Sequence, residues 1–405
     1  GGRFPSPGRV PPACRNKSAF FSHTFHRVCL VNPRNDCILF LLERIPAKIS
    51  SNNINIASRS VLSSPGAVRS ELPLSLDAVV KVMEARREIC DILDGKSQKF
   101  LMIVGPCSLH DTGSAIEYAE RLRQLSDQVK DHILLVMRAY FEKPRTTVGW
   151  KGLIYDPDLN KTYNIEKGIF IARKLMLRIV DIGLPVATEM LDPIIAQYIA
   201  DIVSWAAIGA RTTEAQTHRQ LGSGLSMPVG FKNATDGTFQ TAIDAISTAL
   251  SEHSFIGVLE DGHVGVFRTR GNPYAHIVLR GGNGQPNYGA EHIAFLKVAM
   301  QKAHLKPSII VDCSHANSGK DYRKQHIALE DVLSQIEAGE TAIRGVMLES
   351  NLLPGSQKIV SGCRPTPGLS VTDGCIGWDV TAELIRSTYA RLAALHPAAP
   401  ATPES

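Results

Sequence analysis

Residues 100–137, FLMIVGPCSLHDTGSAIEYAERLRQLSDQVKDHILLVM, contain one complete strand–helix–strand unit. The stretch begins and ends with short apolar runs, at 100–104 and 132–137. Between them, apolar residues recur over 113–125 with the spacing of an amphipathic helix. Short strands that are apolar on both faces are typical of a parallel sheet covered by helices. The stretch therefore predicts a βαβ unit.

The same alternation continues along most of the chain. Further apolar runs lie at 184–187, 205–209, 228–231, 275–279, 308–311 and 345–348. Further helical patterns lie at 165–182, 236–250, 290–303 and 322–337. Eight strand-and-helix units over about 300 residues favour an α/β fold of the (β/α)8 TIM-barrel type over an open doubly wound sheet. No GxGxxG or GxxxxGKS motif follows any of the runs, so the dinucleotide-binding and P-loop classes lack their fingerprint.

One segment departs from this rhythm. Residues 254–268 alternate between apolar and polar or small residues on both sides of Asp261-Gly262. An Asp-Gly pair between two alternating runs is a strong signal for a β-hairpin. We expect an inserted β-hairpin between barrel strands five and six.

The composition excludes several classes of function. Apolar residues make up 44% of the chain and charged residues 20%, as in an ordinary globular protein. Beyond residue 50 the chain has 36 basic and 37 acidic residues, so it lacks the basic field of a nucleic-acid-binding protein. No apolar run approaches the ~20 residues that span a bilayer, and we expect no membrane partner. The eight cysteines are scattered without a CxxC pair, which favours a reducing compartment, and we expect a cytoplasmic protein.

The ends of the chain differ from its centre. Residues 1–50 have eight Lys and Arg against two acidic residues, are rich in Pro and Ser, and show no periodicity. We expect 1–50 to be a disordered or non-native extension; an organelle transit peptide of similar composition is the alternative. We further expect an N-terminal arm and helix at 51–98, the catalytic barrel at 99–396 and a disordered tail at 397–405.

Polar residues follow the apolar runs, and in a TIM barrel these strand ends converge on the active site. Four of them have side chains that can bind a metal ion, namely Cys107, His315, Glu349 and Asp373. Each has a simpler interpretation alone: a buried thiol, a core histidine, or surface carboxylates. Together they form a donor set of mixed hardness that suits Mn²⁺, Fe²⁺, Co²⁺ or Zn²⁺ better than Mg²⁺ or Ca²⁺.

A second group at the strand ends is cationic. It consists of Arg138, Lys143, Arg211, Lys232 and Arg280. Such residues are often solvated or paired with nearby acids, but Arg138 and Lys232 end strongly apolar runs, where an unpaired charge is costly. Phosphate and carboxylate groups are natural partners for them. The sequence therefore predicts a divalent metal beside a pocket for a polyanionic substrate.

At these residues the sequence closely resembles the type I 3-deoxy-D-arabino-heptulosonate-7-phosphate (DAHP) synthases, most of all the tyrosine-sensitive branch. The resemblance covers about residues 52–395. It rests on GPCSLHD (105–111), MRAYFEKPRTTVGWKG (137–152), IGARTTEAQTHR (208–219), VGFKNATDGT (229–238), VLRGG (278–282), VDCSHANSGKDYR (311–323), MLESN (347–351) and SVTDGCIGW (370–378). It implies a TIM barrel, one divalent metal and the condensation of phosphoenolpyruvate with erythrose 4-phosphate, the first step of the shikimate pathway.

The resemblance also implies roles for single residues. The metal ligands are then Cys107, His315, Glu349 and Asp373. The phosphoenolpyruvate site comprises Arg138, Lys143, Arg211, Lys232, Arg280 and His315. The erythrose 4-phosphate site comprises Lys143, Pro144, Arg145 and Thr146. Catalytic roles fall to Lys143, His315, Cys107 and Asp373, with Lys143 as the candidate proton donor to the new alkoxide.

Two alternative functions remain at this point. One is the related 3-deoxy-octulosonate-8-phosphate synthase, whose segment at the Lys143–Thr147 position differs and contains Asn. The other is a non-catalytic metabolite sensor, which loss of a metal ligand would favour. All four ligand types are present here.

The resemblance finally implies feedback inhibition by an aromatic amino acid. The matching effector positions are Gln197, Leu221, Ser226, Phe255 and Gly257. A hairpin that only covers a barrel edge or forms a subunit contact is the alternative. Position 257 is Gly, as in tyrosine-sensitive members, where phenylalanine-sensitive ones tend to have Ser. We therefore expect tyrosine to be the effector, and we expect a homo-oligomer, either a dimer or a tetramer.

Overall fold

The computed structural model describes residues 52–360 and 362–395. The chain divides into two units, residues 1–61 and 62–405. The predictions for segments 1–50 and 397–405 lie outside the described residues. Helices α1 and α2 belong to the same compact unit as the barrel. The division proposed at residue 98 stays a prediction.

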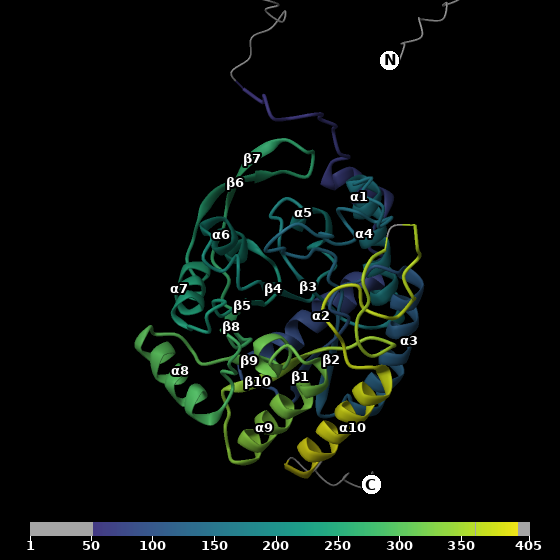
Figure 1. Cartoon of the computed structure of the whole chain (residues 1–405). Coiled ribbons are helices and arrows are strands. Elements are labelled where there is room, and N and C mark those ends of the chain that lie inside the picture. Colours follow the sequence, from purple (N-terminus) through teal and green to yellow (C-terminus); the bar gives the residue numbers. More distant parts are fainter. Residues whose placement is uncertain (1–51, 361, 396–405) are drawn as a thin grey trace, which may run out of the picture. The chain divides into compact units, whose positions relative to one another are not determined.

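The second unit is built on a closed barrel of parallel strands (Figure 1). Around the barrel the strand order is β1-β10-β9-β8-β5-β4-β3-β2. The bounds are β1 Phe100–Gly105, β2 Ile133–Arg138, β3 Val186–Glu189, β4 Trp205–Ile208, β5 Val229–Lys232, β8 Ala275–Leu279, β9 Ile309–Asp312 and β10 Ile343–Glu349. The expected (β/α)8 fold is confirmed.

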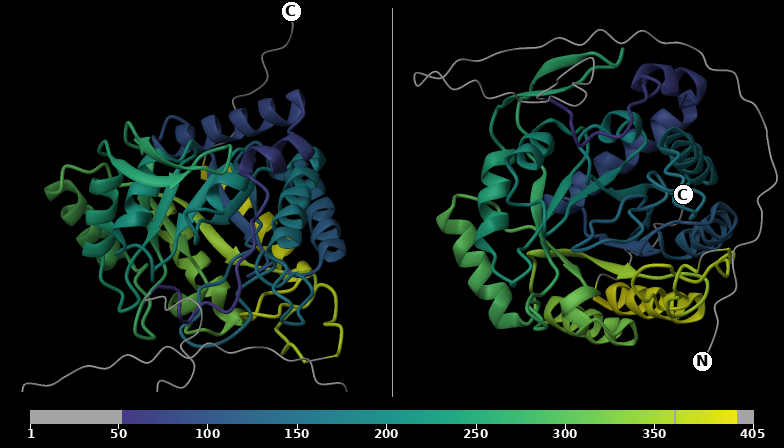
Figure 2. Two further views of the ribbon diagram at one scale, coloured as in Figure 1. Left: turned by 90° about the horizontal axis from the view of Figure 1, so that it is seen from above. Right: turned by 45° about the horizontal axis from the view of Figure 1, so that its top comes forward.

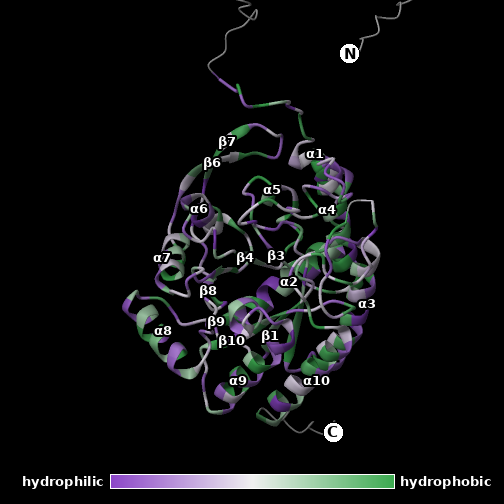
Figure 3. Cartoon of the chain, in the orientation of Figure 1, coloured by the Kyte–Doolittle hydropathy of each residue, from purple (hydrophilic) through white to green (hydrophobic). Residues whose placement is uncertain are grey.

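Helices follow the strands and surround the barrel (Figure 2). Their bounds are α1 Pro65–Glu71, α2 Leu76–Leu93, α3 Thr112–Val129, α4 Ile165–Ile182, α5 Ala196–Ile199, α6 Gln216–Gly224, α7 Gln240–Ala249, α8 Ala290–Lys302, α9 Gln325–Glu337 and α10 Trp378–Leu395, with short 3-10 helices η1 His315–Ser318 and η2 Tyr322–Lys324. Hydrophobic and hydrophilic residues alternate along these helices, as expected where one face packs on the sheet (Figure 3). No helix among the described residues is long and apolar enough to cross a membrane.

The barrel interior is apolar at the end where the strands begin. In register, Leu101 of β1 lies opposite Leu134 of β2 and Gly345 of β10, and two residues later Ile103 lies opposite Val136 and Met347. Side chains two apart on a strand share a face, so these residues form successive layers. Leu101, Ile103, Val136 and Met347 belong to a buried cluster with Trp205, Ala207, Val278 and Ile310, which also includes Ile89, Ile92 and Leu93 of α2. Helix α2 therefore shares one apolar core with the barrel interior.

Most strands begin or end one or two residues away from the apolar runs in the sequence, whereas β8 coincides with its run at 275–279. Five strands end on a charged residue, namely Arg138, Glu189, Lys232, Asp312 and Glu349. The apolar pattern stopped before these residues, but their backbones still belong to the strands and their side chains are buried. Each lies two residues beyond an interior position, so its side chain shares the interior face. The charged groups therefore form the last layer of the barrel interior.

The inserted hairpin is confirmed. Strands β6 (Ser254–Val258) and β7 (Val264–Arg268) pair antiparallel, between barrel strands β5 and β8. Gly262 in the turn has φ +89°, a left-handed conformation that favours glycine. The backbone carbonyl of Glu260 in this turn accepts the amide of Gly66 at 2.7 Å, and its carboxylate pairs with Arg69 at 3.0 Å. The hairpin tip is thereby attached to α1.

Candidate active site

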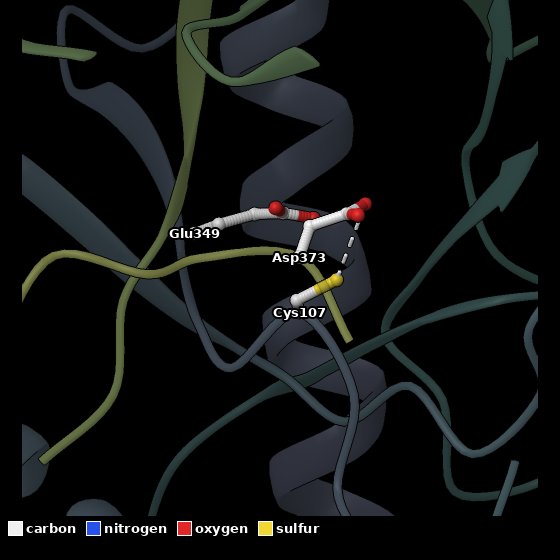
Figure 4. Close-up of side chains that lie close together, drawn as sticks. All are labelled: Cys107, Glu349 and Asp373. Carbon is white, nitrogen blue, oxygen red and sulfur yellow. Dashed lines mark hydrogen bonds between the residues drawn. The ribbon is translucent and has the colours of Figure 1, made fainter. Parts of the chain in front are cut away.

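Three of the four expected metal ligands lie together at the end of the barrel where the strands finish. Cys107 follows β1, Glu349 ends β10, and Asp373 belongs to the long loop before α10. One ligand atom from each lies within 4.8 Å of the others (Figure 4). Cys107 and Glu349 are buried, whereas Asp373 is exposed. The group is therefore open to solvent on one side only.

The chemistry of this group fits a divalent cation. Burial, with the charge of Glu349, raises the pKa of the Cys107 thiol to about 11. The thiol Sγ donates to Asp373 Oδ2 at 3.8 Å, and Glu349 Oε1 lies 3.1 Å from Arg138 Nη2. Two carboxylates this close to a thiol oppose its ionisation. A bound cation would displace the thiol proton and neutralise the negative charge of the carboxylates. The group would accordingly hold a metal ion.

His315, the fourth expected ligand, is outside this three-residue group. It begins η1, with two residues between it and the end of β9, and has φ +58°. Its Nδ1 lies 3.0 Å from Asp312 Oδ2 and 2.8 Å from Ser314 Oγ. A carboxylate that holds Nδ1 fixes the ring and leaves Nε2 free to act as a ligand. The structure thus brings together three of the predicted ligands and orients the fourth through Asp312.

Asp312 also holds the buried cation Lys232. The Lys232 Nζ lies 2.8 Å from Asp312 Oδ2, with both side chains buried. Burial opposes ionisation of Asp312, but Lys232 and His315 outweigh it and hold its pKa well below the usual range. Sequence reasoning missed Asp312, although it directly follows an apolar run in VDCSH. A carboxylate at that position was the available signal.

The remaining expected cations lie around the same end of the barrel. Arg138 is fully buried, Lys143 and Arg280 are half-buried, and Arg211 is exposed. Burial lowers the pKa of Arg280, and Arg211 lowers it further, while Asp312 opposes both. The charges of Arg211 and Arg280 are therefore close enough to repel one another. Such a cluster favours binding of an anion.

Lys143 interacts electrostatically with two of the three candidate metal ligands, Cys107 and Glu349. Burial alone would lower its pKa, but attraction from Cys107 and Glu349 outweighs this and raises it. Its ammonium lies 5.5 Å from the centre of the Tyr140 ring. The side chain is therefore protonated at neutral pH and close to the group that would hold a metal.

Lys143 also begins the segment expected to hold the aldose phosphate. After Lys143 the segment turns outward: Pro144 is half-buried, and Arg145 and Thr146 are exposed. The Lys143 amide donates to the Lys151 carbonyl at 2.8 Å, and Arg145 Nε donates to the Trp150 carbonyl at 2.7 Å. These bonds close the segment into a loop, which we call the 143–155 loop.

Two further carboxylates are buried here without an assigned role. Glu189 ends β3, and its Oε1 is buried without a hydrogen-bond partner among the described residues. Glu142 is also buried and directly precedes Lys143. One sequence signal pointed to Glu189, namely its place at a strand end. No such signal pointed to Glu142, which lies within a segment of mixed polarity.

Asparagine side chains hold the backbone around the cations. Asn233 Oδ1 accepts the Arg280 amide at 2.8 Å. Asn317 Nδ2 donates to the carbonyls of Leu279 and Asp312 at 3.1 and 2.9 Å. Both asparagines are buried. They fix the ends of β8 and β9, from which Arg280 and His315 project.

The expected effector residues come from three elements. Gln197 lies on α5, Leu221 on α6 with Ser226 just beyond it, and Phe255 and Gly257 on β6. Helix α6 contacts β6, whereas α5 packs against α1 and α4. The Phe255 and Phe267 rings stack at 5.6 Å, and a Cβ on Gly257 would come within 2.7 Å of the Phe267 ring. The space beside Gly257 is thus occupied by Phe267.

A closed parallel barrel with metal-type ligands and clustered cations at one end defines a TIM-barrel enzyme that acts on anionic small molecules.

Residues 71–386 match the model of the DAHP synthetase I family. The chain is 48% identical over 346 residues to the Tyr-sensitive phospho-2-dehydro-3-deoxyheptonate aldolase of Escherichia coli K12, covering 84% of this chain and 96% of that protein. It is 50% identical over 336 residues to the Phe-sensitive enzyme of the same organism, covering 83% and 96%.

A solved structure agrees with these matches. The phospho-2-dehydro-3-deoxyheptonate aldolase of Francisella tularensis SCHU S4 superposes with a TM-score of 0.81 at 43% identity, covering 84% of this chain and 98% of that one. The chain belongs to the DAHP synthetase I family. It has the activity of 3-deoxy-7-phosphoheptulonate synthase in the shikimate pathway, and its family is metal-dependent. The alternatives of an octulosonate synthase and of a sensor are thereby set aside.

Proposed function

We propose that Cys107, His315, Glu349 and Asp373 hold one divalent ion, drawn from Mn²⁺, Fe²⁺, Co²⁺ or Zn²⁺. The observation that supports this most strongly is the approach of Cys107, Glu349 and Asp373 within 4.8 Å. A thiolate and an imidazole beside two carboxylates form a donor set for these metals. Asp312 supports the assignment of His315, because its contact with Nδ1 leaves Nε2 for the ion.

Phosphoenolpyruvate is assigned to the cation cluster. Arg138, Lys143, Arg211, Lys232, Arg280 and His315 make up this site. Two of these cations are already paired, Arg138 with Glu349 and Lys232 with Asp312. Lys143, Arg211 and Arg280 supply the positive charge that remains for a phosphate and a carboxylate.

Erythrose 4-phosphate is assigned to Lys143, Pro144, Arg145 and Thr146. The exposed Arg145 and Thr146 offer a guanidinium and a hydroxyl to its phosphate. Lys143, at the inner end of the loop, faces both substrates. This placement holds the aldehyde carbon next to the carbon of phosphoenolpyruvate that attacks it.

The chemistry follows from these positions. When bound, the metal supplies Lewis-acid polarisation of the aldehyde oxygen. The cation cluster, chiefly Lys143, Arg211 and Arg280, holds phosphoenolpyruvate so that its C3 attacks the aldehyde and positive charge develops at C2, where water adds before phosphate leaves. Lys143 gives its proton to the new alkoxide, and its raised pKa keeps it protonated until that step. Cys107, His315 and Asp373 take part through the metal.

Phosphate release from phosphoenolpyruvate tests these assignments. We expect release with erythrose 4-phosphate, little release with a five-carbon aldose phosphate, and loss of release after chelation. Mn²⁺ or Co²⁺ should restore it. Equal rates with both aldose phosphates would contradict the role of the Lys143–Thr146 segment.

We further propose feedback inhibition by tyrosine, bound between the hairpin and α5 and α6. The contact between α6 and β6 and the attachment of the hairpin tip to α1 support a regulatory role for the hairpin. The Tyr-sensitive and Phe-sensitive relatives are 48% and 50% identical, so identity alone does not separate the two effectors. Gly257 is the residue on which the choice of tyrosine rests.

Inhibitor titrations test this choice. Tyrosine should inhibit more strongly than phenylalanine or tryptophan, with a coupling of about 1–3 kcal/mol. Gly257→Ser should weaken inhibition, because its Cβ would displace the Phe267 ring. Ser254→Ala, at an exposed position of the same strand, is the matched control. Stronger inhibition by phenylalanine would contradict the argument from Gly257.

Assembly into a dimer or tetramer is part of the proposal. Ile256, Val264 and Val266 expose 76%, 74% and 64% of their surface along the hairpin. Exposed apolar side chains gathered in this way are typical of interfaces. Light scattering should give a multiple of the 44.1 kDa chain mass, and a monomer at working concentration would contradict this.

A further inference from the structure

The buried Glu142 and the half-buried Asp192 have a single phenol between them. Tyr155 Oη lies 3.2 Å from Glu142 Oε1 and 3.1 Å from Asp192 Oδ2. A phenol has one proton and can donate to only one of the two oxygens. The second contact is a hydrogen bond only if one of the carboxyl groups has kept its own proton. A proton on one of the two carboxyl groups would let both contacts be hydrogen bonds.

The proton belongs on Glu142. Its side chain is 2% exposed, whereas Asp192 is half-buried. Asp192 Oδ1 also accepts the Ile194 amide at 2.8 Å, which suits a carboxylate. Burial and the charge of Asp192 raise the pKa of Glu142 to about 8. Glu142 then donates to Tyr155, and Tyr155 donates to Asp192, so that every donor is used.

The same glutamate connects two loops at the active end of the barrel. Glu142 Oε2 accepts longer contacts from the amides of Leu191 and Asp192, at 3.4 and 3.5 Å, in the segment after β3. Tyr155 lies at the far end of the 143–155 loop. The loop base is closed by the bond from Ile154 to the Phe141 carbonyl. Glu142 thus joins both ends of the loop to the neighbouring strand end.

The groups around Glu142 are few. Asp192 faces it from the segment after β3, and Tyr155 from its own loop. From α6, His218 Nε2 contacts the Leu191 carbonyl at 2.6 Å, on the other side of the same backbone segment. The adjacent Lys143 interacts electrostatically with Cys107, Glu349, Arg138 and Glu189 on the barrel interior. Glu142 and Lys143 therefore interact with different groups. Glu142 contacts the two loops, and Lys143 faces the barrel interior where the reaction is proposed to occur.

We propose that Glu142 is a positioning residue for the condensation, and that its neutral carboxylic acid form holds the 143–155 loop so that Lys143 and Arg145 meet the aldose phosphate. The inference rests on the proposed assignment of that segment to erythrose 4-phosphate. When Glu142 ionises, two negative charges face Tyr155, and the bond that Glu142 donated is lost. The loop then loosens and the aldose phosphate binds more weakly.

The pH dependence of KM for erythrose 4-phosphate tests this role, with phosphoenolpyruvate saturating. In the wild type this KM should rise about tenfold between pH 7 and pH 9, less than the ~100-fold cost of a full 1 Å misplacement. Glu142→Gln, whose amide donates as the acid does, should keep a low KM throughout. Glu117→Gln, on the exposed face of α3, is the matched control and should follow the wild type. A flat wild-type KM, or the same rise in Glu142→Gln, would overturn the proposal.

Two further measurements separate the possible failures. If Arg145→Ala leaves the KM for erythrose 4-phosphate unchanged, the substrate assignment fails and the positioning role fails with it. If Arg145→Ala raises that KM while Glu142→Gln still titrates like the wild type, the positioning role alone fails. Infrared spectra at pH 7 should show a protonated carboxyl band in the wild type that Glu142→Gln lacks. Identical spectra would place no proton on Glu142 and overturn the proposal directly.

Discussion

The two ends of the barrel interior are built from the same strands but differ in what they bury. In the middle of the barrel, Ile103, Val136 and Met347 form an apolar layer, in one buried cluster with the core residues of α2. Two residues further along, β2 and β10 end in Arg138 and Glu349, which pair at 3.1 Å. Burying apolar side chains stabilises the fold, whereas burying charges costs free energy that pairing only partly offsets. The difference assigns stability to one end and substrate binding to the other.

Removing a buried cation from the charged end should have the largest effect. Lys232→Ala leaves Asp312 buried without its 2.8 Å partner. We expect about 100- to 1000-fold lower kcat, as for loss of one preorganised charge. The free energy of unfolding should fall by about 3–5 kcal/mol. Activity and denaturant unfolding measure the two effects.

The double variant Lys232→Ala with Asp312→Ala is the control for this experiment. It removes both charges, so stability should partly return while activity stays low. If activity returned together with stability, Lys232 would be a structural residue and the contrast between the two ends would be lost.

At the apolar end, Ile103→Ala should change stability alone. Loss of this fully buried side chain should lower the free energy of unfolding by about 2–5 kcal/mol. The KM values and metal content of the folded protein should stay close to the wild type. A changed KM for phosphoenolpyruvate would show that the two ends are coupled.

Arg145→Ala removes a charge at the charged end of the barrel from a side chain that is not buried. Arg145 is exposed, so stability should be unaffected. The KM for erythrose 4-phosphate should rise about 10- to 100-fold, as expected for a charged hydrogen bond worth roughly 1.5–3 kcal/mol. The KM for phosphoenolpyruvate should change far less. Equal increases for both substrates would mean that this segment binds the other phosphate.

The last prediction concerns the stability of Glu142→Gln against pH. The pKa of Glu142 is about 8 in the folded protein, above its ordinary value of 4.5. Between these values the folded state binds a proton that the unfolded state has lost, so stability falls as pH rises. The glutamine of Glu142→Gln does not titrate, so the variant does not lose stability in this way as pH rises. Its melting temperature should match the wild type near pH 5 and exceed it near pH 8; a constant difference would contradict the assigned protonation.

The sequence predicted the parts of the fold that depend on local pattern. The hairpin at residues 254–268 agrees with β6 and β7, because Asp261-Gly262 fixes the turn and alternation fixes the strands. Strand ends were placed too early at Arg138 and Lys232, because the pattern followed polarity while hydrogen bonding continued through charged residues. Patterning cannot show that an interior face becomes charged in its last layer.

The site was predictable where residue chemistry is specific. Cys107, Glu349 and Asp373 come together, as a metal site predicted from their residue types would require. Asp312 and Glu142 were missed because their roles depend on partners far away in sequence, Lys232 and Asp192. The stacking of Phe267 beside Gly257 was equally hidden, since it depends on cross-strand register. These contacts required the three-dimensional structure.

Metal content measured together with activity tests the central claim most directly. Metal-free protein titrated with Mn²⁺ should bind one ion per chain, and formation of 3-deoxy-D-arabino-heptulosonate 7-phosphate should rise in proportion. Cys107→Ser should need far more Mn²⁺ for both, because a hydroxyl is a poor ligand compared with a thiolate. Ile103→Ala, from the apolar end, should still bind one ion per folded chain. Full activity of the metal-free protein, or undiminished Mn²⁺ binding by Cys107→Ser, would contradict the account.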